Sequence, residues 1–175
     1  MGKYRHSVRI ASRGGASGWL LLCLATVALA QTVELPNRKD PLEGVTTAGQ
    51  PTAAAFAAAA AAGYRAVIDL RGPQEVRGLD EKATVEGLGM SYTTLPVEGG
   101  AGVTYSNAAA LDRLLGELPG PVLIHCSSGN RAGALLALRA KLNGADNDVA
   151  LALGVSAGLA GLQSTVADKL TQGHD

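Results

Sequence analysis

Residues 122–133, which read VLIHCSSGNRAG, decide the fold expected for this chain. The segment opens with the short apolar run Val122–His125, which is typical of a buried parallel strand. A turn of small residues follows. From Arg131 to Asn143 the leucine-rich sequence predicts a buried helix that ends before Gly144. A strand joined to a helix by a glycine-containing turn is the repeating unit of α/β proteins, so we expect a layered fold with a mostly parallel sheet.

The sequence on both sides continues the alternation of strands and helices. Gln31 to Gly44 is polar and is expected to be an extended lead-in, followed by a short edge strand at 45–47. The alanine-rich run 53–62 predicts a helix capped by Thr52. Apolar spacing and β-branched content predict further elements, which are helices at 75–88, 111–118, 146–157 and 159–170 and strands at 66–70 and 90–95.

Composition excludes several classes of protein. The chain has 175 residues, which suits one domain, and its 15 basic and 15 acidic residues cancel. From residue 31 onward there are 11 basic and 15 acidic residues, and only 3% of the chain is aromatic. Nucleic-acid binding needs basic patches or stacking platforms, so we expect no nucleic-acid partner.

The first thirty residues predict a targeting signal. Four basic residues precede position 14, and the twelve-residue apolar run Trp19–Ala30 ends in the small-x-small pattern ALA. Twelve residues are too few to span a bilayer as a helix. We therefore expect a signal peptide at 1–30, cleaved after Ala30, and a periplasmic or secreted protein with no membrane contact after cleavage. The alternatives are a retained anchor or a buried core helix.

Cleavage leaves Cys126 as the single thiol, in the turn after the expected strand 122–125. Ligands of α/β sheets bind at the carboxyl ends of strands, where this turn lies. Small residues at Ser127, Ser128, Gly129 and Asn130 allow backbone N–H groups to form a concave anion site, which the helix N-terminus extends. Arg131 adds a planar fork for two oxygens. The positive surroundings favour the thiolate, so Cys126 is a candidate nucleophile. The alternative is an ordinary glycine-containing turn with an incidental cysteine.

Three segments carry a family resemblance: HCSSGNR at 125–131, GQP at 49–51 and DLR at 69–71. The chain from about Val45 to about Ala140 resembles the bacterial beta-lactamase hydrolase-like proteins, which belong with the cysteine-dependent dual-specificity and tyrosine phosphatases. The resemblance implies a phosphatase-like three-layer α/β domain, placed at 45–175, and a phosphocysteine intermediate without metal or cofactor. It implies that Cys126 is the nucleophile and Arg131 the phosphate clamp, and that His125 holds the loop and favours the thiolate. The implied substrate is a phosphorylated small molecule or a phosphoprotein.

The same loop departs from the phosphatase pattern in one way that favours a different enzyme. Only four residues separate Cys126 from Arg131, where the superfamily usually has five, and this shorter loop resembles rhodanese-type sulfurtransferases. Ala132 also stands where many phosphatases carry a hydroxyl. Three hypotheses follow: a phosphatase, a sulfurtransferase that uses a Cys126 persulfide, and a non-catalytic anion-binding module.

A phosphatase also needs a general acid for the leaving oxygen. Glu98 lies 28 residues before Cys126 in a glycine-rich loop, about where the superfamily places its acid. Asp69 ends another expected strand and is the second candidate for the general acid. The alternatives are a solvated carboxylate for Glu98 and an ion pair or turn cap for Asp69.

Overall fold

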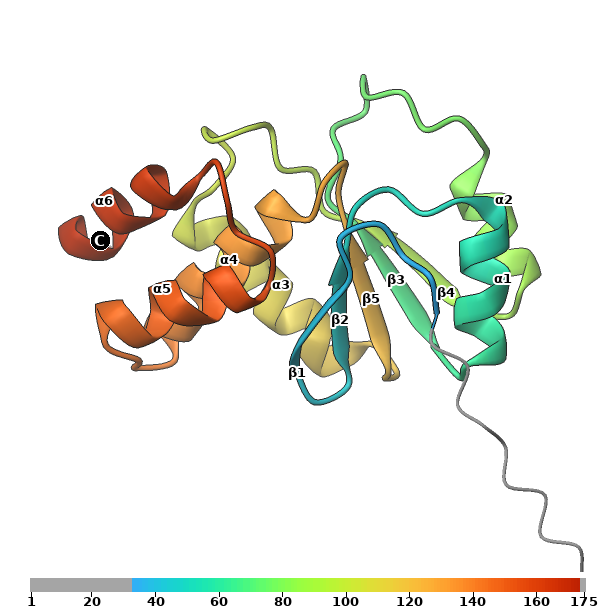
Figure 1. Cartoon of the computed structure of the whole chain (residues 1–175), viewed down its shortest axis with the longest axis horizontal. Coiled ribbons are helices and arrows are strands. Elements are labelled where there is room, and N and C mark those ends of the chain that lie inside the picture. The colour runs from blue at the N-terminus through green and yellow to red at the C-terminus, as the bar shows by residue number, and fades with distance from the viewer. Residues whose placement is uncertain (1–32, 174–175) are drawn as a thin grey trace, which may run out of the picture.

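The computed structural model describes residues 33–173, in which a five-stranded sheet carries helices on both faces (Figure 1). The strand order is β1-β2-β5-β3-β4. Only β1 runs antiparallel to its neighbour, and the β2–β5, β5–β3 and β3–β4 pairs are parallel. The strands are β1 (Lys39–Leu42), β2 (Val45–Ala48), β3 (Ala66–Asp69), β4 (Ser91–Thr94) and β5 (Val122–His125). The predicted α/β fold with a mostly parallel sheet is confirmed.

Of the six helices in the described residues, four cover the two faces of this sheet. One face packs against α1 (Ala53–Ala61) and α2 (Glu81–Gly87), and the other against α3 (Tyr105–Glu117) and α4 (Asn130–Leu142) (Figure 1). The last two helices, α5 (Asn147–Ser156) and α6 (Gln163–Gln172), pack on α4. Helix α4 is therefore covered on several sides, which explains why residues 131–138 are all buried.

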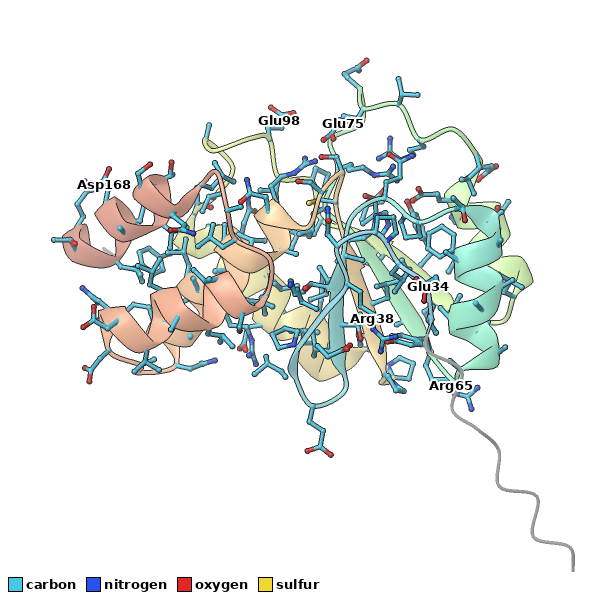
Figure 2. The ribbon with its side chains drawn as sticks, viewed as in Figure 1. Glu34, Arg38, Arg65, Glu75, Glu98 and Asp168 are labelled. Atoms are coloured by element: carbon cyan, nitrogen blue, oxygen red, sulfur yellow. The ribbon has the colours of Figure 1, made fainter. Side chains whose placement is uncertain are left out.

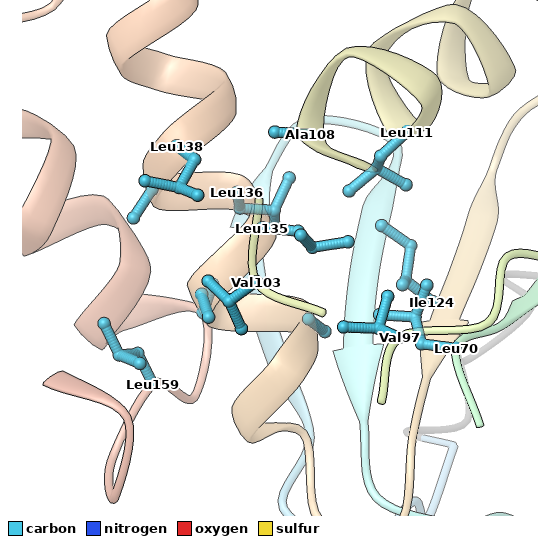
Figure 3. Close-up of a cluster of buried hydrophobic side chains, with 14 of the residues drawn as sticks. Leu70, Val97, Val103, Ala108, Leu111, Ile124, Leu135, Leu136, Leu138 and Leu159 are labelled. Carbon is cyan, nitrogen blue, oxygen red and sulfur yellow. The ribbon is translucent and has the colours of Figure 1, made fainter. Parts of the chain in front are cut away.

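Alternation along the central strands separates two cores. Ile68 and Ile124 face the α3–α4 side, together with Leu111 and Leu135 (Figure 3). Val67 and Leu123 face the α1–α2 side with Phe56. Because successive side chains of a strand point to opposite faces, His125 and Cys126 leave the end of β5 on opposite sides of the sheet.

Most predicted elements are confirmed with small shifts at their ends. Thr52 caps α1 by accepting a hydrogen bond from the N–H of Ala55 at 3.2 Å. Gly144 follows α4 with φ +90°, the left-handed conformation that favours glycine after a helix. The single helix expected at 111–118 is longer, since α3 begins six residues earlier, at Tyr105, after the Thr104 cap.

Two predictions were wrong. The helix expected at 75–88 begins only at Glu81, because Asp80 caps it by accepting a hydrogen bond from Ala83 N at 3.0 Å and Gly78, with φ +74°, interrupts any earlier turn. The lead-in expected at 31–44 contributes β1, so β2 is an interior strand rather than an edge.

The expected signal at 1–30 lies outside the described residues, and the expected domain boundaries stay predictions. Among residues 33–173, no helix is both long enough and apolar enough to cross a bilayer.

Candidate active site

The thiol of Cys126 lies at the carboxyl end of β5, directly below the loop that leads into α4. The residue is 0% exposed, and its Sγ accepts a hydrogen bond from the N–H of Gly129 at 3.0 Å. Gly129 has φ +90°, and a Cβ there would sit 3.5 Å from the backbone of Ala48. The left-handed conformation brings an amide onto the sulfur, so glycine is needed at this position for conformational reasons.

Hydrogen bonds from outside the loop orient its peptide groups. The carbonyl of Ser127 accepts from Gln50 N at 3.3 Å, and the carbonyl of Ser128 accepts from Asn37 Nδ2 at 3.2 Å. In a trans peptide the N–H points opposite to the carbonyl, so the amides of Ser128 and Gly129 point away from these outer partners. Within residues 33–173, the N–H groups at 127, 128, 130 and 131 donate no hydrogen bond. The loop therefore retains free donors for an anion, and the segment at 49–51 supports it.

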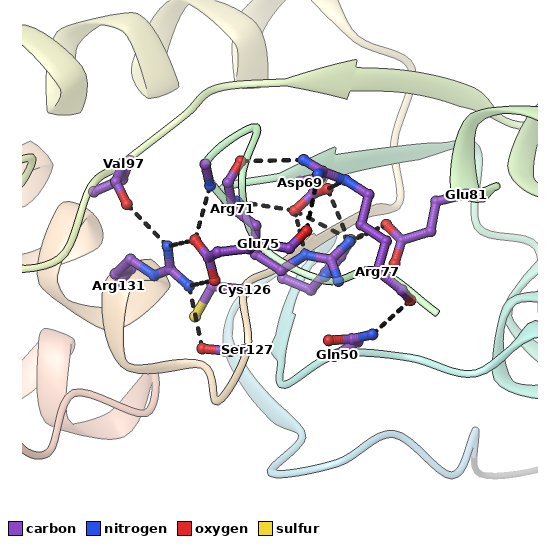
Figure 4. A network of polar contacts seen from close by, with 12 residues as sticks. Gln50, Asp69, Arg71, Glu75, Arg77, Glu81, Val97, Cys126, Ser127 and Arg131 are labelled. Carbon is purple, nitrogen blue, oxygen red and sulfur yellow. Dashed lines mark hydrogen bonds and ion pairs between the residues drawn. The ribbon is translucent and has the colours of Figure 1, made fainter. Parts of the chain in front are cut away.

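The guanidinium of Arg131 lies beside the thiol and is almost fully hydrogen bonded. The residue is 7% exposed. Its Nη1 donates to Glu75 Oε1 at 2.5 Å and to the carbonyl of Val97 at 2.9 Å. Its Nη2 donates to Glu75 Oε2 at 2.8 Å and to Ser127 Oγ at 3.1 Å (Figure 4). The hydrogen bonds to Glu75 raise the pKa of Arg131 against an opposing effect of burial, so it stays charged.

Sequence reasoning missed Glu75, because the segment was assigned to a helix. The carboxylate also accepts from Gly72 N at 2.8 Å. Hydrogen bonds from Arg131 hold the pKa of Glu75 below its ordinary value, against a smaller opposing effect of burial. A signal was present in the sequence: Pro73 and Gly78 mark a loop, and this loop follows the strand next to β5. A carboxylate there faces the same sheet end as Arg131.

The second candidate acid, Asp69, lies in a buried charged cluster and not on the open rim. Its carboxylate receives Arg71 Nε and Nη2, both at 2.9 Å, and the hydroxyl of Tyr92 at 2.9 Å. Burial alone would raise the pKa of Asp69, but the Arg71 hydrogen bonds and the nearby His125 hold it far below its ordinary value. A general acid must carry a proton, so the prediction that Asp69 serves as the acid was wrong. The alternative, an ion pair, is what the structure contains.

His125 belongs to the same buried cluster. Its Nε2 lies 3.3 Å from Glu81 Oε2 and 3.9 Å from Asp69 Oδ1, and its ring meets Phe56 edge-on at 5.9 Å. Its backbone carbonyl accepts a hydrogen bond from the N–H of Leu70, the residue after β3, at 2.9 Å. Alternation along β5 turns its side chain to the face opposite Cys126, and within the described residues no hydrogen bond joins that side chain to the 126–131 loop. Its expected role in holding the loop and favouring the thiolate stays a prediction.

The donor atoms of Asp69, Glu81 and His125 lie within 4.8 Å of one another, a spacing that suits a metal ion. Arg71 occupies the centre of this group: it binds Asp69 at 2.9 Å and Glu81 at 2.5 Å. A cation would have to displace a buried guanidinium that already pairs with both carboxylates. We therefore assign these residues to a buried ion-pair cluster and not to a metal site.

Glu98 lies at the rim, as expected. It is exposed, and it follows Val97, whose carbonyl binds Arg131. A Cβ placed on Gly72 would lie 3.7 Å from Glu75 Oε1 and 3.8 Å from Glu98 Cγ, so the two glutamates are neighbours at one end of the molecule (Figure 2). A solvated carboxylate on the glycine-rich loop 98–102 is free to reorient toward a substrate.

The remaining predicted loop residues have distinct positions. Ser127 and Ser128 are exposed, and the Ser127 hydroxyl is bound to Arg131. Asn130 Oδ1 accepts from Ala160 N at 2.8 Å. This bond ties the loop 126–131, which we call the cradle, to the connection between α5 and α6. The Asn130 side chain therefore supports the loop, while its free amide remains available to a ligand.

Comparison with known proteins shows the family to which the chain belongs. The family model described as beta-lactamase hydrolase-like protein, phosphatase-like domain, matches residues 42–143. The chain belongs to this family. A beta-lactamase hydrolase-like protein from Agrobacterium fabrum is 35% identical over 106 residues, which cover 58% of this chain and 24% of that protein. The chain thus matches about a quarter of the length of that relative.

Solved structures share the fold. A candidate phosphatase from Neisseria meningitidis Z2491 aligns with a TM-score of 0.64 at 21% identity, covering 74% of this chain and 96% of that one. TpbA from P. aeruginosa, solved as a Cys-to-Ser variant in complex with phosphotyrosine, aligns with a TM-score of 0.58 at 22% identity, covering 86% and 93%. The phosphatase-like fold and family expected from the sequence are confirmed.

Proposed function

We propose that this chain is an exported, cysteine-dependent phosphomonoesterase. One observation carries the proposal: a buried thiol, free loop amides and an arginine fork lie together at one sheet end, in a family of phosphatase-like domains. The amides and Arg131 suit the equatorial oxygens of a phosphoryl group, whose charge they stabilise in the transition state.

In the proposed reaction, the Cys126 thiolate attacks phosphorus in line with the ester oxygen. A sulfur–phosphorus bond forms, the phosphorus–oxygen bond breaks, and Glu98 in its acid form protonates the departing oxygen. Water then attacks the phosphocysteine, Glu98 takes its proton, and the sulfur leaves as thiolate with release of inorganic phosphate. Because the thiol is fully buried, a group that covers it must give way when substrate enters.

The proposed substrate is a phosphorylated small molecule or a phosphoprotein. The phosphotyrosine complex of the structurally similar TpbA supports this class. Export rests on the basic start and the apolar run 19–30 of the sequence. Intact-mass measurement of the protein from its host tests export, with Gln31 as the expected first residue.

A rhodanese-like sulfurtransferase is the second candidate, favoured by the four-residue spacing between Cys126 and Arg131. The two are separated by one assay pair: release of phosphate from p-nitrophenyl phosphate, and formation of thiocyanate from thiosulfate and cyanide. We expect phosphate release that Cys126→Ser abolishes. Thiocyanate formation without phosphate release would identify the sulfurtransferase, and phosphate binding without either turnover would identify a binding module.

A further inference from the structure

We infer that Glu75 is a positioning residue, which sets the guanidinium of Arg131 so that one edge remains available to a phosphoryl group. The inference rests on the proposed function, in which Arg131 is the phosphate clamp. It concerns a residue outside all three segments that carry the family resemblance.

The hydrogen bonds of Arg131 show which edge is held. A guanidinium has five N–H groups. Glu75 takes one from each Nη, and the carbonyl of Val97 takes the second from Nη1. No oxygen within the described residues accepts from Nε, and the second N–H of Nη2 goes only to the hydroxyl of Ser127. Within the described residues, the hydroxyl of Ser127 is thus the one oxygen bound at the Nε–Nη2 edge, and two parallel N–H groups are what an oxyanion needs.

Glu75 is itself fixed from several directions, as a support must be. Gly72 N donates to its carboxylate, and Arg77 Nη1 donates to its carbonyl at 3.3 Å. Arg77 is held in turn, since its Nε lies 3.3 Å from Asp69 Oδ2 and its carbonyl accepts from Gln50 Nε2 at 2.7 Å (Figure 4). The loop is therefore tied both to the buried cluster and to the segment that supports the cradle.

Without Glu75 the Arg131 side chain would keep its charge but lose the contact that fixes its plane. The Val97 carbonyl and Ser127 hydroxyl are single-point partners and allow the guanidinium to rotate. Bidentate binding depends on that plane, so both phosphate affinity and the rate should fall. Glu75→Gln retains one acceptor oxygen and should fall between wild type and Glu75→Ala.

The test measures inorganic phosphate binding by calorimetry, and kcat and KM for p-nitrophenyl phosphate, in Glu75→Ala, Arg131→Ala and the double variant. Loss of one charge-assisted contact should weaken phosphate binding and lower kcat/KM by about tenfold to a hundredfold in Glu75→Ala. In the Arg131→Ala background the same substitution should change both quantities less than about twofold, because its partner is already absent. Gln74→Ala, an exposed neighbour on the same loop, is the control and should match wild type.

Two results would overturn the inference. Equal losses from Glu75→Ala in both backgrounds would mean that Glu75 acts on the loop and not through Arg131. Tighter phosphate binding in Glu75→Ala would mean that the carboxylate blocks the site. If the wild-type protein hydrolyses no phosphate ester, the proposed function fails, while phosphate binding still decides the role of Glu75.

Discussion

Two groups of polar and charged residues lie at the same end of the sheet and differ in how far their charges are removed from solvent. The buried cluster (Asp69, Arg71, Glu81 and His125) is at most 1% exposed, and its carboxylates share one guanidinium. The cradle edge (Glu75, Cys126, Ser127 and Arg131) has a 35% exposed Glu75 side chain and an arginine with one edge open. The adjacent residues His125 and Cys126 belong to different groups because a strand turns them to opposite faces.

The comparison separates charges that stabilise the protein from charges that bind a ligand. A fully buried charge must be paired at all times, because leaving it uncompensated is costly. The cradle edge retains an unused guanidinium edge and unused amides, which is acceptable only because water or an anion can reach them. Substitutions in the buried cluster should therefore change stability, and substitutions at the cradle edge should change binding and rate.

The largest effect is expected at the thiol. Cys126→Ser should reduce phosphate ester hydrolysis on the order of 10⁴-fold or more, since the nucleophile is lost. Phosphate binding should remain within about threefold of wild type, because the amides and Arg131 are unchanged. Steady-state kinetics and calorimetry measure the two quantities. Near-wild-type turnover in this variant would show that the reaction does not pass through Cys126.

The next effect concerns the rim carboxylate. Glu98→Gln should lower kcat for phenyl or alkyl phosphates by about 10²–10⁴-fold, with a smaller loss for p-nitrophenyl phosphate, whose leaving group is a weaker base. The matched control is Glu86→Gln, an exposed carboxylate on α2, which should behave as wild type. A uniform loss across all leaving groups would assign Glu98 a role other than proton transfer.

The segment 122–133 predicted the strand, the loop and α4 because each obeys a local rule: apolar run, small-residue turn and leucine-rich helix. The same locality explains the failures. The helix expected to start at Glu75 was wrong for a local reason, since Gly78 and the Asp80 cap delay its start. The role of Glu75 was missed because its partner Arg131 lies 56 residues away in the chain. Asp69 ends a strand and Glu98 follows one, so the sequence could not rank them as acids. Burial distinguishes them: Arg71 and α2 cover Asp69, whereas Glu98 stays exposed.

Breaking the buried cluster should lower stability. Arg71→Met keeps most of the side-chain volume but leaves Asp69 and Glu81 without their shared partner. We expect the free energy of unfolding to fall by about 3–5 kcal/mol. Urea denaturation measures the change. Arg65→Met, at an exposed arginine, is the control and should stay within about 0.5 kcal/mol of wild type. A small loss in Arg71→Met would mean that the cluster is not a stabilising unit.

The smallest expected effect is on the free energy of unfolding at acid pH, which should depend on the buried cluster and not on the cradle edge. The pKa of Asp69 is far lower in the folded protein than the ~3.9 of an unfolded aspartate. Its contribution to stability is therefore fully present above about pH 4 and is lost progressively as the pH falls below that value. One such group changes the free energy of unfolding by at most about 1.4 kcal/mol per pH unit. Asp69→Asn should be less stable than wild type at pH 7. Its free energy of unfolding should fall less steeply as the pH is lowered (a flatter acid limb), so that the values of the two proteins converge between about pH 4 and 2.5.

Glu75→Gln supplies the contrast at the cradle edge. The pKa of Glu75 is also lowered, but its side chain is 35% exposed, and a partly solvated ion pair contributes little to stability. The acid limb of this variant should therefore follow wild type, although its phosphate binding is weaker. Urea denaturation at half-unit steps from pH 7 to 2.5 measures all three proteins. An unchanged acid slope in Asp69→Asn, or a flattened one in Glu75→Gln, would reverse the assignment of the stabilising charge from the buried cluster to the cradle edge.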